Sequence, residues 1–323
     1  MRRLIRLITP LVAATALLST AAIAQSRGTD TISFTVPYSA GGSADTLARQ
    51  LGEIIRKQSG TVLVIENQGG AGGAIGAATV ARARADERRV MLASTSALTI
   101  SPNLRQVSYD PIQDFKPLLG VAIGPIAMLA SRNAPFKDFK GMLDYAKANP
   151  QAVRYGTPGA GSVAHLAMEE LQLRADVSLT HVPYKGESPA IQDALGGVTE
   201  LLVVNTPTVI PHVQAGTLQP LAVFEPQRMP VWPNVPTMSE VGYDKLEYNS
   251  DFGIFAPASM PADQRDNIAA LFKQAVASDE FKQTLDKLSL LPSPTQGDEY
   301  AAKIAEENKR NAEIIKVRNI APE

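Results

Sequence analysis

The sequence contains no cysteine, and histidine and tryptophan are scarce, with three and one respectively. The absence of cysteine excludes a disulfide framework and a lipid anchor attached through a cysteine thiol. The histidines, His165, His181 and His212, are far apart in the chain, and the sequence has no H-x-x-x-H pair. We therefore expect no metal site of the common histidine and cysteine types.

Three frequent enzyme signatures are also missing. No serine stands in the G-x-S-x-G pattern of a nucleophile elbow, and no glycine-rich loop ends in the Lys-Ser or Lys-Thr of a Walker A motif. In GGAGGAIGA, glycines at 70 and 72 are followed by isoleucine at 75, where a dinucleotide fingerprint needs a third glycine. We therefore expect no cofactor.

The one long apolar run lies at the N-terminus. Three arginines within the first six residues precede LITPLVAATALLSTAAIA, which ends in an A-x-A pattern at Ala24. This order is typical of a cleavable secretory signal peptide, so residues 1–24 are predicted to be removed and the mature protein to be periplasmic. A membrane anchor is the alternative, but Pro10 and the many Ala and Thr residues make the run a poor span, which needs roughly 20 strongly apolar residues.

The charge balance argues against two classes of partner. Lys and Arg (31) nearly equal Asp and Glu (32), and loss of the first 24 residues removes three arginines and no acid. The remaining chain is mildly acidic, so we expect neither nucleic acid nor an anionic membrane surface as a partner.

After residue 24, short β-rich runs alternate with amphipathic patterns. TISFTVPY, TVLVIEN and RRVMLAST are predicted strands, and the segment after the first places Leu47, Leu51 and Ile55 on one helical face. This β-α-β-α-β order predicts a parallel sheet covered by helices on both faces.

The alternation resumes in the middle of the chain, and the C-terminal part is mostly helical, which predicts two α/β lobes joined by a hinge of two crossings. We expect the crossings near Gly124 and Phe224. The predicted division is residues 25–124 for the first part of lobe 1, 125–223 for lobe 2, and 224–323 for the hinge return and the completion of lobe 1.

Small, hydroxyl-rich loops follow the predicted strands: PYSAGGSAD, ASTSAL, GTPGAGSVAH, VPYKGES and VVNTPT. In open α/β sheets, ligands bind at the carboxyl ends of the strands, and the helices that follow direct N–H groups and partial positive charge to the same place. Neither PYSAGGSAD nor GTPGAGSVAH contains an arginine. The pattern therefore favours a small carboxylate held by backbone amides, hydroxyls and water.

The candidate ligand-binding residues come from these loops and from the last predicted strand. They are Tyr38, Ser39, Gly41, Gly42, Ser43, Asp45, Ser94, Thr95, Thr157, Gly161, Ser162, His165, Lys185, Asn205, Thr206 and Asp251. Three have alternative interpretations: Ser43 as a helix N-cap, Asp45 as a partner of the helix dipole, and His165 as a core residue. We expect Ser43 and Ser162 to face each other across the cleft and to bind the same ligand.

Five stretches, VPYSAGGSADTLAR, VIENQGGAGGAIGA, YGTPGAGSVAHLAMEEL, HVPYKGESPAIQDALGG and FGIFAPASMP, resemble the Bug-type (TctC-like) extracytoplasmic solute receptors of tripartite tricarboxylate transporters. The resemblance implies a type II periplasmic-binding-protein fold that closes on a small carboxylate, with a large and a small membrane subunit as partners. It also places ligand contacts in the loops at 38–45 and 157–162. The chain departs from the family pattern at Val204, where Asp is frequent, and at Asp251, where an aromatic residue is frequent.

Two other functions are compatible with this pattern. An exported hydrolase or isomerase of similar layout could use His165 with Ser162 or Asp45. A receptor of the same kind could instead pass its signal to a membrane sensor. The receptor interpretation predicts a monomer that binds a carboxylate stoichiometrically and leaves it unchanged.

The signal-peptide interpretation predicts that the exported protein begins at Gln25. Intact-mass spectrometry of protein recovered from the periplasm should show loss of residues 1–24. Exported protein that retains Met1 to Ala24 would contradict the prediction.

Overall fold

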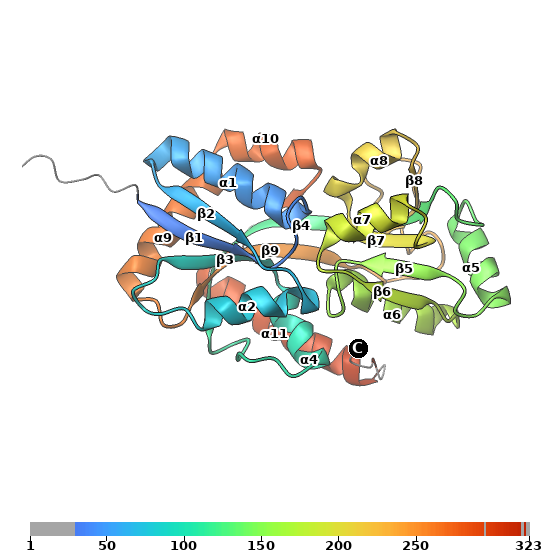
Figure 1. Ribbon diagram of the computed structural model, residues 1–323, viewed down its shortest axis with the longest axis horizontal. Helices are drawn as coiled ribbons and strands as arrows, with labels where there is room; N and C mark the ends of the chain where they lie inside the picture. The colour runs from blue at the N-terminus through green and yellow to red at the C-terminus, as the bar shows by residue number, and fades with distance from the viewer. Residues whose placement is uncertain (1–29, 294, 318–319, 321–323) are drawn as a thin grey trace, which may run out of the picture. The chain divides into compact units, whose positions relative to one another are not determined.

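The computed structural model describes residues 30–293, 295–317 and 320 of the chain (Figure 1). The predicted signal peptide lies outside the described residues, and the chain from Thr31 onward belongs to one unit. Among the helices that are described, none combines the length and the apolarity needed to cross a membrane.

A mixed ten-stranded sheet runs through the described residues in the order β2-β1-β3-β9-β4-β7-β5-β6, with β8 and β10 also paired to β4. β1 is parallel to β2 and β3, and β5 is parallel to β6 and β7, whereas β4 and β9 are antiparallel to their neighbours. The strands are β1 (Thr31–Val36), β2 (Val62–Asn67), β3 (Arg89–Ser94), β4 (Phe115–Ser131), β5 (Arg154–Thr157), β6 (Thr180–Pro183), β7 (Leu201–Asn205), β8 (Leu218–Val223), β9 (Asn249–Pro257) and β10 (Leu291–Pro292).

The connections between parallel strands are mostly helical, as expected for crossovers. The helices are α1 (Ser43–Ser59), α2 (Ala74–Ala81), α3 (Ser96–Thr99), α4 (Ser101–Leu104), α5 (Phe139–Ala148), α6 (Val163–Ala175), α7 (Glu187–Leu195), α8 (Ile210–Gln214), α9 (Ala262–Ala277), α10 (Asp279–Leu288) and α11 (Gly297–Val317), with short 3-10 turns at Ala71–Gly73 and Thr206–Thr208.

Strand β4 joins two halves of the sheet. Its residues 115–125 pair with β9, whereas residues 126–131 pair with β7 and β8. We call the part built on β1, β2, β3, β9 and β10 lobe 1, and the part built on β5, β6, β7 and β8 lobe 2. Figure 1 shows β4 and β9 passing between the two groups of elements.

Each lobe buries apolar side chains on both faces of its sheet, as the β-α-β order predicts. In lobe 1, α1, α9 and α10 pack on one face and α2 and α11 on the other. In lobe 2, α5 and α6 cover one face and α7 the other. Leu47, Leu51 and Ile55, predicted to share a face, are fully buried or nearly so. Burying one such side chain stabilises the fold by about 1.5–3 kcal/mol.

The C-terminal part of the chain contacts both lobes. Phe224, Met238 and Leu246 belong to the hydrophobic core of lobe 2, and the chain then returns to lobe 1 along β9. Helix α11 begins in lobe 1, where Tyr300 is buried, and Ile315 near its end packs in the core of lobe 2. The boundaries near residues 124 and 224 stay predictions.

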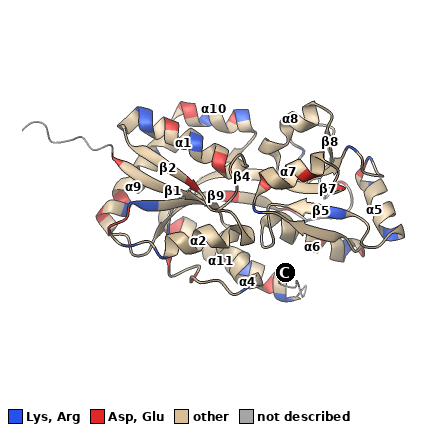
Figure 2. Ribbon diagram, viewed as in Figure 1, with Lys and Arg blue, Asp and Glu red and all other residues tan. Residues whose placement is uncertain are grey.

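Charged residues contribute less to this architecture than the apolar cores. Figure 2 shows both signs along α1 and α10. The ion pair between Lys57 and Glu280 joins these two helices at 2.6 Å, but about half of each side chain is exposed. An exposed pair of this kind contributes about 0–1 kcal/mol.

A buried carboxylate lies where the two lobes join. Glu225 follows β8, is only 7% exposed, and its Oε1 has no hydrogen-bond partner. Burial raises the pKa of Glu225 to about 7, and the nearby Glu247 adds to the shift, while the backbone of Ile126 opposes it. An unfolded glutamate has a pKa near 4.5. Between these two pH values the carboxyl of Glu225 is therefore mostly protonated in the folded protein and mostly ionised in the unfolded chain. The contribution of Glu225 to the free energy of unfolding therefore falls as the pH rises from 4.5 to about 7.

We predict that Glu225→Gln stabilises the protein at pH 8 and has little effect at pH 4. The difference between the pKa values sets an upper limit of about 3 kcal/mol on the gain. Urea unfolding at both pH values measures it, with Glu306→Gln on the exposed side of α11 as the control. Equal effects of Glu225→Gln at pH 4 and pH 8 would contradict the prediction.

Candidate ligand-binding site

A cavity lies between the lobes, at the carboxyl ends of the parallel strands. This is where the loop pattern placed the ligand. The cavity is small, with a volume of about 30 Å³ open to a water-sized sphere. Its lining residues are Tyr38, Gly42, Ser43, Ala44, Ser94, Ser96, Ile126, Pro158, Ser162, Val163, Ala164, Glu187, Asn205, Ser250 and Phe252.

Two long helices begin at the cavity. Helix α1, of 17 residues, starts at Ser43 in lobe 1, and α6, of 13 residues, starts at Val163 in lobe 2. The first N–H groups of a helix have no partner within the helix and carry partial positive charge. The cavity therefore has an anion-attracting group on each side.

The two paired glycines in the loop before α1 have different roles. Gly41 has φ +79°, a left-handed conformation that favours glycine, and a Cβ there would lie 3.1 Å from Ser188 Oγ. Gly42 has φ −79° and ψ 174°, which any residue adopts. A Cβ on Gly42 would meet Glu187 Oε2 at 3.4 Å. Gly42 thus gives space to a carboxylate of the chain itself and imposes no turn strain.

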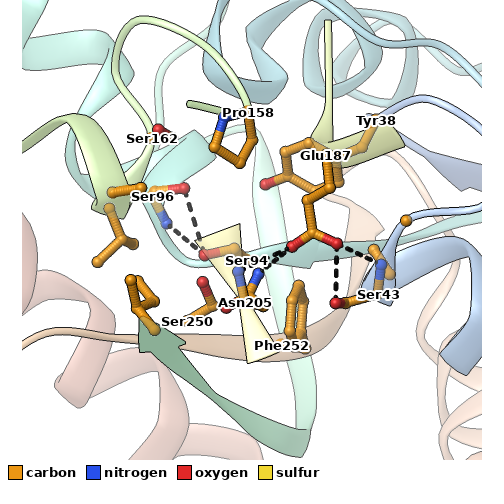
Figure 3. A pocket seen from close by; sticks show the side chains of 15 residues that line it. Tyr38, Ser43, Ser94, Ser96, Pro158, Ser162, Glu187, Asn205, Ser250 and Phe252 are labelled. Atoms are coloured by element: carbon orange, nitrogen blue, oxygen red, sulfur yellow. Dashed lines mark hydrogen bonds between the residues drawn. The ribbon is translucent and has the colours of Figure 1, made fainter. Parts of the chain in front are cut away.

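The carboxylate of Glu187 points into the cavity (Figure 3). Its Oε2 accepts hydrogen bonds from the backbone N and the Oγ of Ser43, at 2.7 and 2.8 Å. Its Oε1 accepts bonds from the backbone N and the Nδ2 of Asn205, at 3.3 and 2.5 Å. Because Ser43 belongs to lobe 1 and Asn205 to lobe 2, this side chain joins the lobes.

Burial and hydrogen bonding act on Glu187 in opposite directions. Burial raises the pKa of Glu187 above its ordinary value, although the four donors from Ser43 and Asn205 favour the ionised form. Burial also raises the pKa of Tyr38 to about 12, with a contribution from the charge of Glu187. Tyr38 is therefore a neutral phenol at physiological pH.

In the lining, Asn205 Oδ1 is a buried polar atom without a hydrogen-bond partner. The Tyr38 hydroxyl lies beside Ser94 and Ser96, and hydrogen bonding with these residues lowers its pKa against the effect of burial. The amide nitrogen of Asn205 is directed to Glu187, so the carbonyl oxygen is the atom that stays unpaired. Buried polar atoms are normally satisfied, so Asn205 Oδ1 indicates a place for a hydrogen-bond donor of a ligand.

Loops next to the cavity also join the lobes. Ser39 N donates to Lys185 O at 3.0 Å, and Ser188 Oγ donates to Ala40 O at 2.8 Å. Ser101 Oγ of lobe 1 lies 3.3 Å from Gly161 O of lobe 2. The lobes are therefore in contact through several loops.

The structure brings six of the predicted ligand-binding residues to the cavity lining: Tyr38, Gly42, Ser43, Ser94, Ser162 and Asn205. The hydroxyl of Ser43 bonds Glu187, and the N-cap of α1 is Gly42, so the N-cap alternative for Ser43 is wrong. Ser162 is the N-cap of α6, since its Oγ accepts a bond from His165 N at 3.2 Å. A ligand contact for these six residues stays a prediction.

The other ten predicted residues are not among the lining residues: Ser39, Gly41, Asp45, Thr95, Thr157, Gly161, His165, Lys185, Thr206 and Asp251. Asp45 pairs with Arg49 at 3.0 Å and accepts a bond from Gly41 N. Burial opposes ionisation of Asp45, but these partners hold the pKa of the carboxyl below its usual value. Asp45 thus stabilises the first turn of α1 and the loop before it, as the alternative interpretation has it.

His165 and Thr157 stabilise the loop before α6. The buried ring of His165 stacks on His181 with the ring centroids 4.3 Å apart, and its Nδ1 accepts a bond from Gly161 N at 3.2 Å. Thr157 Oγ1 lies 2.7 Å from His181 Nε2. The core interpretation of His165 is the one that matches its position.

Asp251 lies inside lobe 1. It is 2% exposed, pairs with Lys303 of α11, and accepts a bond from Ser293 Oγ at 3.1 Å. Its carboxylate is therefore neutralised within the lobe. Of the remaining predicted residues, Lys185 is exposed and meets lobe 1 through its carbonyl oxygen, whereas Thr206 is buried with its Oγ1 unpaired.

Sequence reasoning missed Glu187, whose carboxylate bonds Ser43 across the cavity. In the sequence, Glu187 follows Gly186 at the start of a predicted helix, and an acidic residue in the first turn of a helix is ordinary. It also missed Ser96, Ser250 and Phe252, which line the cavity from α3 and β9. No group of three or more His, Asp or Glu residues in the described part of the chain could hold a metal ion.

The chain matches the family described as "Tripartite tricarboxylate transporter family receptor" over residues 47–320. Solved structures of periplasmic binding proteins are also similar to this chain. The periplasmic binding protein BugD superposes with a TM-score of 0.85 at 29% identity, covering 90% of this chain and 98% of that protein.

Two similar structures from Rhodopseudomonas palustris contain carboxylates. Rpa4515 with adipate has a TM-score of 0.85 at 28% identity and covers 92% of this chain and all of that protein. MatC with bound malate has a TM-score of 0.82 at 27% identity and covers 88% of this chain and 98% of that protein. The likeness confirms the predicted periplasmic-binding-protein fold. The chain belongs to the receptor family of the tripartite tricarboxylate transporters and is a receptor of the Bug (TctC-like) type.

Proposed function

We propose that the protein is a periplasmic receptor that binds a small organic carboxylate between its lobes and passes it to the membrane subunits of a tripartite tricarboxylate-type transporter. It would do so as a monomer, after removal of residues 1–24, and without a cofactor. The observation that carries the proposal is the cavity between the lobes, where the N-termini of α1 and α6 meet. The carboxylates in Rpa4515 and MatC support the choice of ligand class.

The chemistry of the lining supports binding over catalysis. Most polar groups there are serine hydroxyls and helix N–H groups, which hold an anion without reacting with it. The residues that an exported hydrolase would need have other partners. The His165 ring contacts Gly161 and His181, Ser162 Oγ caps α6, and Asp45 pairs with Arg49.

The receptor function predicts binding without turnover. In a thermal-shift screen of mono-, di- and tricarboxylates, a ligand at 100 times its Kd should add about 2.7 kcal/mol to the stability. A protein of this size should then unfold several degrees higher. Proton NMR of the ligand after prolonged incubation should show it unchanged. Conversion of the ligand would favour the enzyme alternative, and no stabilisation by any carboxylate would contradict the proposed function.

Ser162 provides a sharper test of where the carboxylate binds. Its Oγ accepts the bond from His165 N, which leaves the hydroxyl hydrogen available to a ligand in the cavity. Losing one hydrogen bond to a charged group costs about 1.5–3 kcal/mol. Ser162→Ala should therefore raise the Kd for the carboxylate found in the screen by about 10- to 150-fold, measured by titration calorimetry.

Ser278 is the matched control. It caps α10 in the same way, with its Oγ accepting from Phe281 N at 3.2 Å, but it is not a lining residue. Both alanine variants should lose about 1 kcal/mol of stability through the lost cap, and only Ser162→Ala should lose affinity. Equal affinities for the two variants would mean that Ser162 acts as a helix cap alone.

A further inference from the structure

The cavity contains a negative charge that belongs to the protein. Among the lining residues that the structure describes, Glu187 is the one acidic residue, and no Lys, Arg or His is present. It is 5% exposed. A receptor for a multiply charged anion gains nothing from such a group, since a like charge in a buried site repels the ligand.

Glu187 also occupies the anion-attracting side of lobe 1. The backbone N of Ser43 is a first-turn N–H of α1, and Glu187 Oε2 accepts its hydrogen at 2.7 Å. The hydroxyl of Ser43 and the amide nitrogen of Asn205 are directed to the same carboxylate. A ligand carboxylate cannot use these donors while Glu187 holds them. The N-terminus of α6, with Ser162 at its N-cap, is left for a ligand carboxylate.

Glu187 offers a ligand its negative charge. Its two carboxylate oxygens have about four acceptor positions, and the four hydrogen bonds from Ser43 and Asn205 use them. The neighbouring Asn205 Oδ1 is a buried acceptor without a partner. The group that fits beside these atoms is a hydrogen-bond donor, and beside a carboxylate a cationic donor is favoured.

We infer that the cavity selects a monocarboxylate with an ammonium group at its other end, because Glu187 takes the place of a second ligand carboxylate beside Ser43 and Asn205. This inference rests on the proposed function. The ligand carboxylate lies at the α6 side near Ser162, and the ammonium lies against Glu187. The ammonium group and the Glu187 carboxylate then form an ion pair, which lowers the free-energy cost of burying the carboxylate.

Ligand triads of equal length test the inference directly. Succinate, 4-aminobutyrate and butyrate form a four-carbon set, and adipate, 6-aminohexanoate and hexanoate form a six-carbon set. Calorimetric titration of the wild-type protein should show that an amino acid of one set binds at least about tenfold more tightly than the matching dicarboxylate and the plain monocarboxylate.

Two variants and a control separate the role of Glu187 from general effects of charge. Glu187→Gln should remove the preference for the ammonium ligand, and Glu187→Ala should improve binding of the dicarboxylate by about tenfold, because Ser43 and Asn205 become free. Asp193→Asn is the control, since it lies on the same helix α7, changes the charge equally and contacts Tyr184 outside the cavity lining. It should keep the wild-type preference.

The outcomes distinguish the two proposals. Wild-type protein that binds the dicarboxylate as tightly as the amino acid of equal length overturns the inference about Glu187 and leaves the carboxylate receptor intact. Unchanged ligand preference in both Glu187 variants also overturns it. If neither the triads nor the wider carboxylate screen yields a ligand for wild type or variants, the proposed function itself fails. The wild-type measurement does not depend on the folding of any variant.

Discussion

The hydrogen bonds of the Glu187 carboxylate join the two lobes across the cavity and decide which charge the cavity contains. A buried ionised carboxylate is costly unless donors surround it. Here the donors come from two places, Ser43 in lobe 1 and Asn205 in lobe 2, and they meet only when the lobes are together. Separation of the lobes would remove the Ser43 bonds but also return the carboxylate to water. The lobe contact is thus linked to the ionisation and the solvation of one side chain.

The rest of the fold makes this linkage effective. Strand β4 pairs with β9 in lobe 1 and with β7 and β8 in lobe 2, and α11 carries buried residues in the cores of both lobes. Relative movement of the lobes must therefore bend or slide these two elements. A ligand shifts such an equilibrium only by its difference in affinity for the two arrangements. A ligand that displaced Glu187 from Ser43 would break hydrogen bonds that join the lobes. A ligand that binds beside Glu187 and keeps those bonds adds its own contacts to them.

The fold and the place of the cavity could be predicted from the sequence, because both depend on local patterns. Hydrophobic periodicity identifies α1 and the first strands, and the carboxyl ends of parallel strands fix where the loops converge. The contacts inside the cavity could not be predicted, because they join distant residues. Glu187 bonds a residue 144 positions away, and Asp251 pairs with Lys303 of a helix 52 positions away. An acid after a glycine has the same local signal whether it faces water or a buried serine.

Receptors of one fold can therefore differ in which of their anion-binding helix N-termini are occupied by a carboxylate side chain of the protein. A helix N-terminus attracts negative charge whether that charge belongs to a ligand or to a side chain. In this protein α1 and α6 both begin at the cavity, and the donors of α1 are already used by Glu187. The N-terminus of α6 is therefore left for a ligand carboxylate. The part of the cavity next to α1 carries the negative charge of Glu187 and attracts a cationic group. A single acid at the start of α7 thus changes the charge pattern that the cavity recognises, while the strands, helices and loops that form the cavity stay the same.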